Sequence, residues 1–447
     1  MWKCGPAVHG ARGGIEAGGR RPPLANPHSM IRASAGVVPI RQWRRSVDVL
    51  RLSRAGRPVF CLVSHDFSGG TPVHIGHLAA QLEQAGVLVL LLRCSSEGRV
   101  SIATKGLGRI ETLVYNLPGE GGRLLKHLLR IGPAHFHFHS NINIPEEVCA
   151  LPSRCGATYD CTVHDYSWVC PRIHLVDETR MYCKEPRIEF CERCVSISGT
   201  HPVWRLPGAR EQVVARLRER SAAMLSGARR VFCPSEDVRR RITSHFGLPN
   251  AVVRVHSEPY ALPDWTPLLP APGERLRVGV LGAIGVEKGS EVLRRCAYNS
   301  WKRGLPLDFV VIGYTNDDVG LGEMPNVRLS GPYSADGMAA LLKSYQPHLC
   351  FFPAVLPETF SYTLSVALEC GLFPVAFDLG AIAERIRAAR FGELLPLELS
   401  VEPARINETL LACGAALSSV AKPCVPQVRY PDILSDYYGF ASNVDLR

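Results

Sequence analysis

The strongest structural information in this sequence lies in residues 348–384, which read HLCFFPAVLPETFSYTLSVALECGLFPVAFDLGAIAE. Two short apolar runs, His348–Pro353 and Phe373–Phe377, are typical of buried strands. The Ala- and Leu-rich segment between them predicts a helix that ends at Gly371, a residue type favoured just after a helix. Alternating strands and helices of this kind predict an α/β domain with a parallel sheet.

The loop before this helix carries polar residues that suit an anionic ligand. Glu358 lies in the loop, and Thr359 and Ser361 are candidates to cap the helix. Free N–H groups and the helix dipole at a helix N-terminus favour a phosphate group. A carboxylate beside them would accept hydrogen bonds from hydroxyl groups. The pattern therefore indicates either a site for a diphosphate joined to a sugar or an ordinary capped helix.

The first half of the chain contains a related unit. Residues 58–64 predict a strand, and Gly69 and Gly70 precede a helix expected at residues 72–85. Paired glycines let backbone N–H groups approach a ligand closely. The sequence has neither the G-x-G-x-x-G fingerprint of dinucleotide binding nor a phosphate-binding G-x-x-x-x-G-K-[ST] loop, so NAD is not indicated.

The second half restarts the same order of elements. A strand expected at residues 276–281 leads into residues 282–289, which read GAIGVEKG, and then into a helix at residues 290–302. Lys288 places a positive charge in this Gly-rich turn. Right-handed crossovers would bring the carboxyl ends of both sets of strands to one region. We therefore expect two Rossmann-like, doubly wound domains that face a cleft.

Composition divides the chain further, because prolines concentrate between the halves and cysteines within the first half. We expect a basic, disordered extension at 1–57, an N-terminal domain at 58–262 with a Cys-rich insert at 170–204, a Pro-rich linker at 263–275, a C-terminal domain at 276–424 and a final segment at 425–447.

The net charge of +10 is concentrated at the N-terminus. Residues 1–57 contain eleven Lys and Arg against two acidic residues, so the other 390 positions balance near +1. This distribution does not favour a nucleic-acid-binding protein. The extension could touch anionic lipid, or it could be sequence upstream of a true start at Met30. No apolar run approaches the ~18 residues of a membrane helix.

Two groups of side chains raise the question of metal binding. His135, His137 and His139 alternate along one expected strand, so they share a face that is either simply polar or metal-binding. The insert carries four cysteines, of which the last two have C-x-x-C spacing. These are Cys170, Cys183, Cys191 and Cys194. They could hold structural zinc, form disulfides or stay independent thiols. The sixteen cysteines lie mostly in apolar runs, which favours reduced thiols in a cytoplasmic protein.

The motifs, taken together and in order, resemble those of GT-B glycosyltransferases, specifically retaining enzymes of family 4, over about residues 58–445. The resemblance rests on VSHDFSGGTPVHIGHLA, TVHDYSWVCPR, VFCPSEDV, GAIGVEKG, FFPAVLPETFSYTLSVALECGLFPV and FDLGAIAERI. It implies a hexosyltransferase-type enzyme that moves a sugar from a nucleotide-diphosphate sugar to a saccharide or lipid-linked acceptor. Family members of this kind act in cell-surface polysaccharide or glycolipid synthesis, in the cytoplasm or peripherally at the inner face of the membrane, and catalysis would require no cofactor.

The resemblance also implies roles for individual residues. Lys288, Glu358 and His164 would be the catalytic residues, with Lys288 on the donor diphosphate and the other two on the transferred sugar. The residues expected to bind the donor are Gly69, Gly70, Gly285, Gly289, Thr359, Phe360, Ser361 and Gly380. The N-terminal domain would bind the acceptor, the C-terminal domain the donor, and the final segment would cross back to the N-terminal domain.

Two positions depart from the family pattern. The family places a second Glu eight positions after the first, but the chain has Val366 there, and Glu369 could substitute only with a shifted backbone. An Arg common beside the phosphate-binding Lys is replaced by Ala283. These departures keep alternatives open: a non-catalytic protein that binds sugar nucleotides, or a GT-B epimerase or phosphorylase.

Overall fold

The computed structural model describes eight ranges of the 447-residue chain. These are residues 56–66, 69–104, 113–204, 212–256, 265–334, 337–421, 423–425 and 428–441. Nearly all of the basic extension, including Met30, lies outside them. So do residues 257–264, which contain part of the Pro-rich region.

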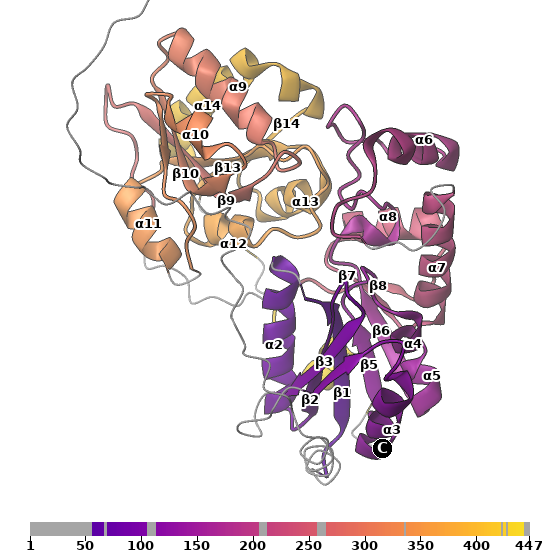
Figure 1. Cartoon of the computed structure of the whole chain (residues 1–447). Helices are drawn as coiled ribbons and strands as arrows, with labels where there is room; N and C mark the ends of the chain where they lie inside the picture. Colours follow the sequence, from indigo (N-terminus) through magenta and orange to yellow (C-terminus); the bar gives the residue numbers. More distant parts are fainter. Residues whose placement is uncertain are drawn as a thin grey trace, which may run out of the picture. The chain divides into compact units, whose positions relative to one another are not determined.

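Two β-sheets with helices on both faces make up the described part of the chain (Figure 1). The predicted α/β class, with two separate doubly wound sheets, is confirmed. None of the described helices is both long enough and apolar enough to span a membrane.

The first sheet has eight strands in the order β4-β3-β2-β1-β5-β6-β7-β8. They are β1 (Val59–His65), β2 (Leu88–Cys94), β3 (Arg99–Thr104), β4 (Leu113–Asn116), β5 (His135–Phe138), β6 (Thr158–Thr162), β7 (Val231–Cys233) and β8 (Ala251–Val253). Strands β2, β1 and β5 to β8 are parallel, whereas β3 and β4 are antiparallel. Strand β3 was not predicted.

Helices cover both faces of this sheet. The helices of this half are α2 (Gly70–Gln84), α3 (Gly121–Ile131), α4 (Glu146–Cys149), α5 (Leu151–Cys155), α6 (Ile188–Ser198), α7 (Val213–Gly227) and α8 (Glu236–Phe246), with a 3₁₀ turn at Tyr166–Trp168. Helix α6 packs on α7. Alternate residues of β1 enter different cores, as the period of a strand requires. Cys61 packs in the core that contains α3 and α7, whereas Phe60 packs with α2.

The second sheet has six parallel strands in the order β11-β10-β9-β12-β13-β14. They are β9 (Leu276–Ile284), β10 (Leu307–Thr315), β11 (Val327–Leu329), β12 (Leu349–Phe352), β13 (Phe373–Phe377) and β14 (Glu393–Leu395). The helices are α9 (Ser290–Lys302), α10 (Asp318–Gly322), α11 (Met338–Tyr345), α12 (Tyr362–Glu369), α13 (Gly380–Ala389) and α14 (Pro403–Ala416), with 3₁₀ turns at Leu397–Val401 and Leu417–Ser419. Val311 faces the core with α9 and α14, and its neighbour Val310 faces the core with α11, α12 and α13.

The final described segment packs on the first sheet rather than on the second. It contains a short π-type helix, Ile433–Tyr437. Tyr437 and Tyr438 are buried with Phe60 and Phe232, and the Tyr438 hydroxyl lies 2.9 Å from Nδ1 of His137, 301 positions earlier. The last residues therefore complete the core on one face of the first sheet.

Candidate functional site

Strand order places two loops side by side in the second sheet. The order reverses between β9 and β12, which are direct neighbours, and such a reversal is where open α/β sheets bind ligands beyond the carboxyl ends of their strands. Lys288 lies in the loop after β9, and Glu358 lies in the loop after β12. The backbone N–H of Val355 donates to the carbonyl oxygen of Glu287 at 3.2 Å, which ties the two loops together.

Lys288 and Glu358 form an ion pair at this point. Nζ of Lys288 lies 3.1 Å from Oε1 of Glu358, and the two side chains are 48% and 16% exposed. They line a cavity of about 20 Å³ together with Ser361 and Thr363. That volume holds about one water molecule. The pair thus presents a cation to solvent and keeps the carboxylate more enclosed.

Two glycines allow the loops to approach each other closely. Gly289 has φ +83°, and a Cβ there would overlap the carbonyl oxygen of Pro353. Gly380 has φ +66°, and a Cβ there would lie 2.8 Å from the backbone nitrogen of Glu358. The Glu358 carbonyl oxygen in turn accepts a hydrogen bond from Ala381 N–H at 2.9 Å. Both positions suit only glycine because of the positive φ and the close backbone. Gly285 is less constrained, since its nearest neighbour for a Cβ is Oε2 of Glu287 at 3.4 Å.

Residues 359–361 shape the loop before α12, each in a different way. The Thr359 hydroxyl donates to the backbone oxygen of His164 at 2.6 Å. Phe360 is buried at 4% exposure. The Ser361 hydroxyl accepts from Leu364 N–H at 3.3 Å and so caps α12, one of the two candidate caps. The side chains of Thr359 and Phe360 are thus committed to protein contacts rather than presented to solvent.

Arg385 of α13 holds this loop in place, and sequence reasoning missed it. Its guanidinium donates to the carbonyl oxygen of Ser361 at 2.8 Å and to the Ser365 hydroxyl at 2.8 Å. It also lies 4.3 Å from the centre of the Phe360 ring. The FDLGAIAERI motif contained Arg385, but nothing in its spacing indicated that it reaches back to α12.

His164 follows β6 and belongs to a group of buried imidazoles. Its Nε2 lies 3.0 Å from Nδ1 of His139, and its ring centre lies 5.0 Å from that of His74. Burial lowers the pKa of His164 well below its usual value, and the nearby rings of His74 and His65 lower it further. His164 is therefore neutral at pH 7 and can exchange hydrogen bonds with a neutral ligand.

The glycines expected on the first sheet lie at the start of α2. Gly69 precedes the helix with φ +134°, and Gly70 is its first residue. A Cβ on Gly70 would lie 3.5 Å from the ring of Tyr362, the first residue of α12. Gly70 therefore lies beside the N-terminus of α12, whose first residue, Tyr362, directly follows Ser361.

The four cysteines of the insert do not assemble into a metal-ligand cluster. Cys191 and Cys194 lie on helix α6, and all four are free thiols. Among the described residues, the group of three or more ligand atoms within 4.8 Å of one another is His74, His139 and His164. The Cys191 sulfur instead accepts from Arg218 at 3.4 Å. Structural zinc at Cys170 and Cys183 with the α6 pair, one of the three alternatives, stays a prediction.

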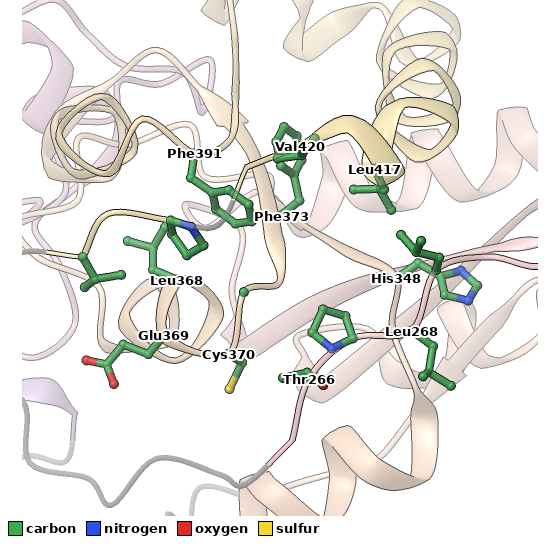
Figure 2. Close-up of a pocket in the computed structure, with 15 residues that line it drawn as sticks. Thr266, Leu268, His348, Leu368, Glu369, Cys370, Phe373, Phe391, Leu417 and Val420 are labelled. Carbon is green, nitrogen blue, oxygen red and sulfur yellow. The ribbon is translucent and has the colours of Figure 1, made fainter.

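One of the two departures from the family pattern, Val366, lies on helix α12. Val366 is 8% exposed and packs in the core between α12 and the sheet, so no carboxylate stands at that position. Glu369 lies about 10 Å further along α12 from Tyr362, because each helical residue rises ~1.5 Å. It lines a separate cavity of about 560 Å³ (Figure 2). That cavity includes His348 and Phe373, at the amino ends of β12 and β13, so Glu369 cannot take the place of the missing carboxylate.

Comparison with known proteins agrees with this arrangement. Residues 68–258 match the model of Glycosyltransferase Family 4. This region of the chain is therefore similar to glycosyltransferase family 4. Comparison with curated proteins gives no match. The family-4 resemblance noted in the motifs is thus confirmed for the first sheet, and it places His164 and Gly70 inside the matched region.

Solved structures extend the likeness to both sheets. Sucrose-phosphate synthase from Thermosynechococcus elongatus is 14% identical, with 80% of this chain and 91% of that chain covered and a TM-score of 0.53. A glycosyltransferase from Rickettsia africae is 12% identical, with coverage of 88% and 96% and a TM-score of 0.53. HepE from Anabaena, in complex with UDP-glucose, is 11% identical, with coverage of 81% and 92% and a TM-score of 0.52. The likeness shows a shared GT-B fold.

Proposed function

We propose that this chain is a retaining glycosyltransferase that moves a hexose from a nucleotide-diphosphate sugar to a hydroxyl acceptor. The observation that carries the proposal is the Lys288–Glu358 pair, 3.1 Å apart, at the strand-order reversal of the second sheet. A cation for a diphosphate and a carboxylate for sugar hydroxyls meet there, which is the combination a sugar nucleotide requires.

Lys288 would stabilise the departing diphosphate. Cleavage of the bond between sugar and phosphate builds negative charge on the leaving group, and a preorganised cation lowers the energy of that state. Lys288 is 48% exposed and sits on a loop fixed by Gly289 against Pro353. The role therefore needs no rearrangement of the loop, only a change of partner for the ammonium group.

Binding of the sugar nucleotide would break the ion pair between Lys288 and Glu358. The cavity of about 20 Å³ is too small for a diphosphate, so the phosphate must approach Lys288 from its exposed side. Glu358 would then accept hydrogen bonds from the sugar. His164, whose backbone already contacts Thr359, would lie on the first-sheet side of the same sugar.

The finer parts of the proposal rest on the likeness to family 4. They are retention of configuration, a hexose as the transferred group, a saccharide or lipid-linked acceptor, and a product in cell-surface polysaccharide or glycolipid. We place the reaction in the cytoplasm, with peripheral contact at the inner face of the membrane. Because HepE was solved with UDP-glucose, UDP-sugars are the first donors to test.

The test is a thermal-shift screen of nucleotide sugars, followed by donor-turnover assays on Lys288→Ala. We expect the variant to fold normally and to lose about 10²–10³-fold in kcat/KM, the range for removing one charge-stabilising donor. Lys302→Ala is the matched control, since Lys302 is also on the second sheet's helices but stacks on Trp301. Turnover of Lys288→Ala at the wild-type rate would refute the role of Lys288.

One observation favours a second candidate, a non-catalytic protein that binds sugar nucleotides. Val366 occupies the position of the second carboxylate and is buried in the core, and Glu369 lies at the other end of α12. Calorimetry with UDP and GDP separates the two candidates. Binding without turnover of any donor supports the non-catalytic protein, and turnover excludes it.

A further inference from the structure

Three imidazoles from separate elements converge near the carboxyl ends of the first sheet's strands. His74 lies in α2, His139 directly follows β5, and His164 follows β6. One ring nitrogen from each lies within 4.8 Å of the other two. His74 is 3% exposed and His139 is 1% exposed, so two of the three rings are withdrawn from solvent while His164 keeps partial access.

Two of these nitrogens already have nearly the spacing of metal ligands. Nδ1 of His139 lies 3.0 Å from Nε2 of His164. A tetrahedral zinc ion with Zn–N bonds of about 2.05 Å separates its ligand nitrogens by about 3.3 Å. The existing hydrogen bond therefore needs only a few tenths of an ångström of movement to become a pair of ligands.

The third ring has a buried nitrogen without a partner. Nδ1 of His74 has no hydrogen-bond partner among the described residues, whereas its Nε2 lies 3.4 Å from the hydroxyl of Tyr437. Metal-bound histidines usually use one nitrogen for the metal and the other for a hydrogen bond that fixes the ring. His74 has this arrangement, with Tyr437 in the supporting role and Nδ1 left for a ligand.

Neighbouring histidines on the same strand behave differently. His137 uses Nδ1 with the Tyr438 hydroxyl and Nε2 with the Thr162 hydroxyl. His135 uses Nδ1 with Thr158, and its Nε2 lies 3.2 Å from the Asp160 carboxylate. Of the three alternating histidines, only His139 reaches the cluster. A buried ring nitrogen without a hydrogen-bond partner is costly in free energy. Nδ1 of His256 is a second such nitrogen among the described residues, and the His256 ring centre lies 3.9 Å from that of His74.

We propose that His74, His139 and His164 bind one divalent transition-metal ion of the zinc type. Neutral imidazoles are good ligands for Zn²⁺, Co²⁺ and Ni²⁺, and three histidines leave a fourth position for His256 or for a small ligand that enters beside His164. This site goes beyond the proposed function, because the sugar transfer proposed above uses no step that runs through the ion.

The test is titration of the metal-free full-length chain with Co²⁺, read by visible absorption. We expect one Co²⁺ per chain with the intense d–d bands of a four-coordinate ion and no thiolate charge-transfer band. Zn²⁺ should displace it. His74→Gln and His139→Gln should each weaken binding more than about tenfold, while circular dichroism and the melting temperature report whether each variant is folded.

Two controls make the outcome specific. His77→Gln alters a half-buried histidine one turn along the same helix, and Cys191→Ser alters the insert; both should bind Co²⁺ as the wild type does. Absence of Co²⁺ binding in the wild type would overturn the proposal. So would binding that survives in both folded histidine variants, or binding that is lost in Cys191→Ser. Because Co²⁺ absorption is measured without a sugar nucleotide, absence of metal binding would leave the turnover assay on Lys288→Ala unaffected.

Discussion

Lys288 and Glu358 show which site residues a sequence can reveal. Each lies in the loop that follows a strand, and adjacent parallel strands deliver the loops after them to one edge of the sheet. The pairing at 3.1 Å was therefore accessible from the strand pattern and motifs. Arg385 and His74 were not, because their contacts depend on how a helix packs rather than on where a strand ends. The contact of Arg385 with the Ser361 carbonyl crosses 24 positions.

Replacement of Gly289 by Ala should disrupt the loop that carries Lys288. The new Cβ would overlap the Pro353 carbonyl oxygen, and the residue would keep a positive φ. We expect a loss of several kcal/mol in the free energy of unfolding, above the ~1–2 kcal/mol that a left-handed conformation alone costs. Urea denaturation measures it.

Gly304→Ala is the control for Gly289→Ala. Gly304 has φ +63°, and a Cβ there would meet nothing within 4 Å. Gly304→Ala should therefore lose only the ~1–2 kcal/mol in the free energy of unfolding that a left-handed conformation costs. Equal losses in the two variants would mean that the Pro353 contact is unimportant.

Glu369 provides a pH-dependent prediction. Burial raises the pKa of its carboxyl above the ordinary 4.5, and Arg385 opposes part of the rise. Folding therefore favours the protonated form, so this contribution to stability is present below the unfolded-state pKa and is lost as pH rises through the folded-state pKa. Glu369→Gln should gain stability relative to the wild type between pH 4 and pH 8.

Urea midpoints of both chains across that range measure the effect, with exposed Glu323→Gln as the control. A wild-type midpoint that rises relative to Glu369→Gln with increasing pH would contradict the assignment.

Among helices and strands, the regular elements were easier to predict than the irregular ones. Strands β9 and β12 have apolar runs bounded by turn residues, and they were predicted within a few positions. Strand β3 was missed although Val100 and Ile102 alternate with polar residues, which is the pattern of a half-buried strand. The C-x-x-C spacing left zinc, disulfides and independent thiols open, and it did not reveal that Cys191 and Cys194 lie on helix α6. Spacing alone could not distinguish a helical segment from a knuckle.

Glu384 of α13 caps α8, and its removal should weaken that helix. Its two carboxylate oxygens accept from Glu236 N–H at 3.0 Å and from Asp237 N–H at 2.8 Å. These are among the first N–H groups of α8, which have no partner within the helix. We expect Glu384→Ala to cost about 1–2 kcal/mol in the free energy of unfolding.

Chemical denaturation measures this cost, and exposed Glu398→Ala serves as the control. Because the carboxylate acts through its charge as well as its oxygens, Glu384→Gln should lose less than Glu384→Ala but more than the control. A stability of Glu384→Ala equal to that of the control would show that water caps α8 equally well.

Across the chain, the two sheets were predicted from the repeated order of strands and helices, and the solved relatives share the fold. The return of the final segment was expected only from the family resemblance. Nothing in its short sequence specifies which sheet its aromatic residues cover. In the structure Tyr437, Tyr438 and Phe440 join the core with Phe60 and Phe232, and Tyr430 donates to the carbonyl oxygen of Val255.

Truncation after Pro431 should therefore destabilise the first sheet. Replacement of one buried aromatic side chain by Ala costs about 3–5 kcal/mol in the free energy of unfolding. The truncation removes several such side chains, so its cost should exceed that of a single core substitution. Hydrogen exchange at β1 amides, together with urea denaturation, measures it. Removal of residues 442–447 alone is the matched control, and an equally large effect there would assign the stability to those residues instead.

The position of Tyr438 has a consequence for synthesis. A ribosome makes β1 and β7 long before it makes the aromatic residues that cover them, since His137 and its partner Tyr438 are 301 positions apart. Until Tyr437 and Tyr438 have left the ribosome, the nascent first half keeps part of an apolar sheet face open to other chains. Such exposed surfaces promote aggregation and recruit chaperones. The core of the earliest-made sheet is therefore completed only after the residues near Tyr438 have been synthesised.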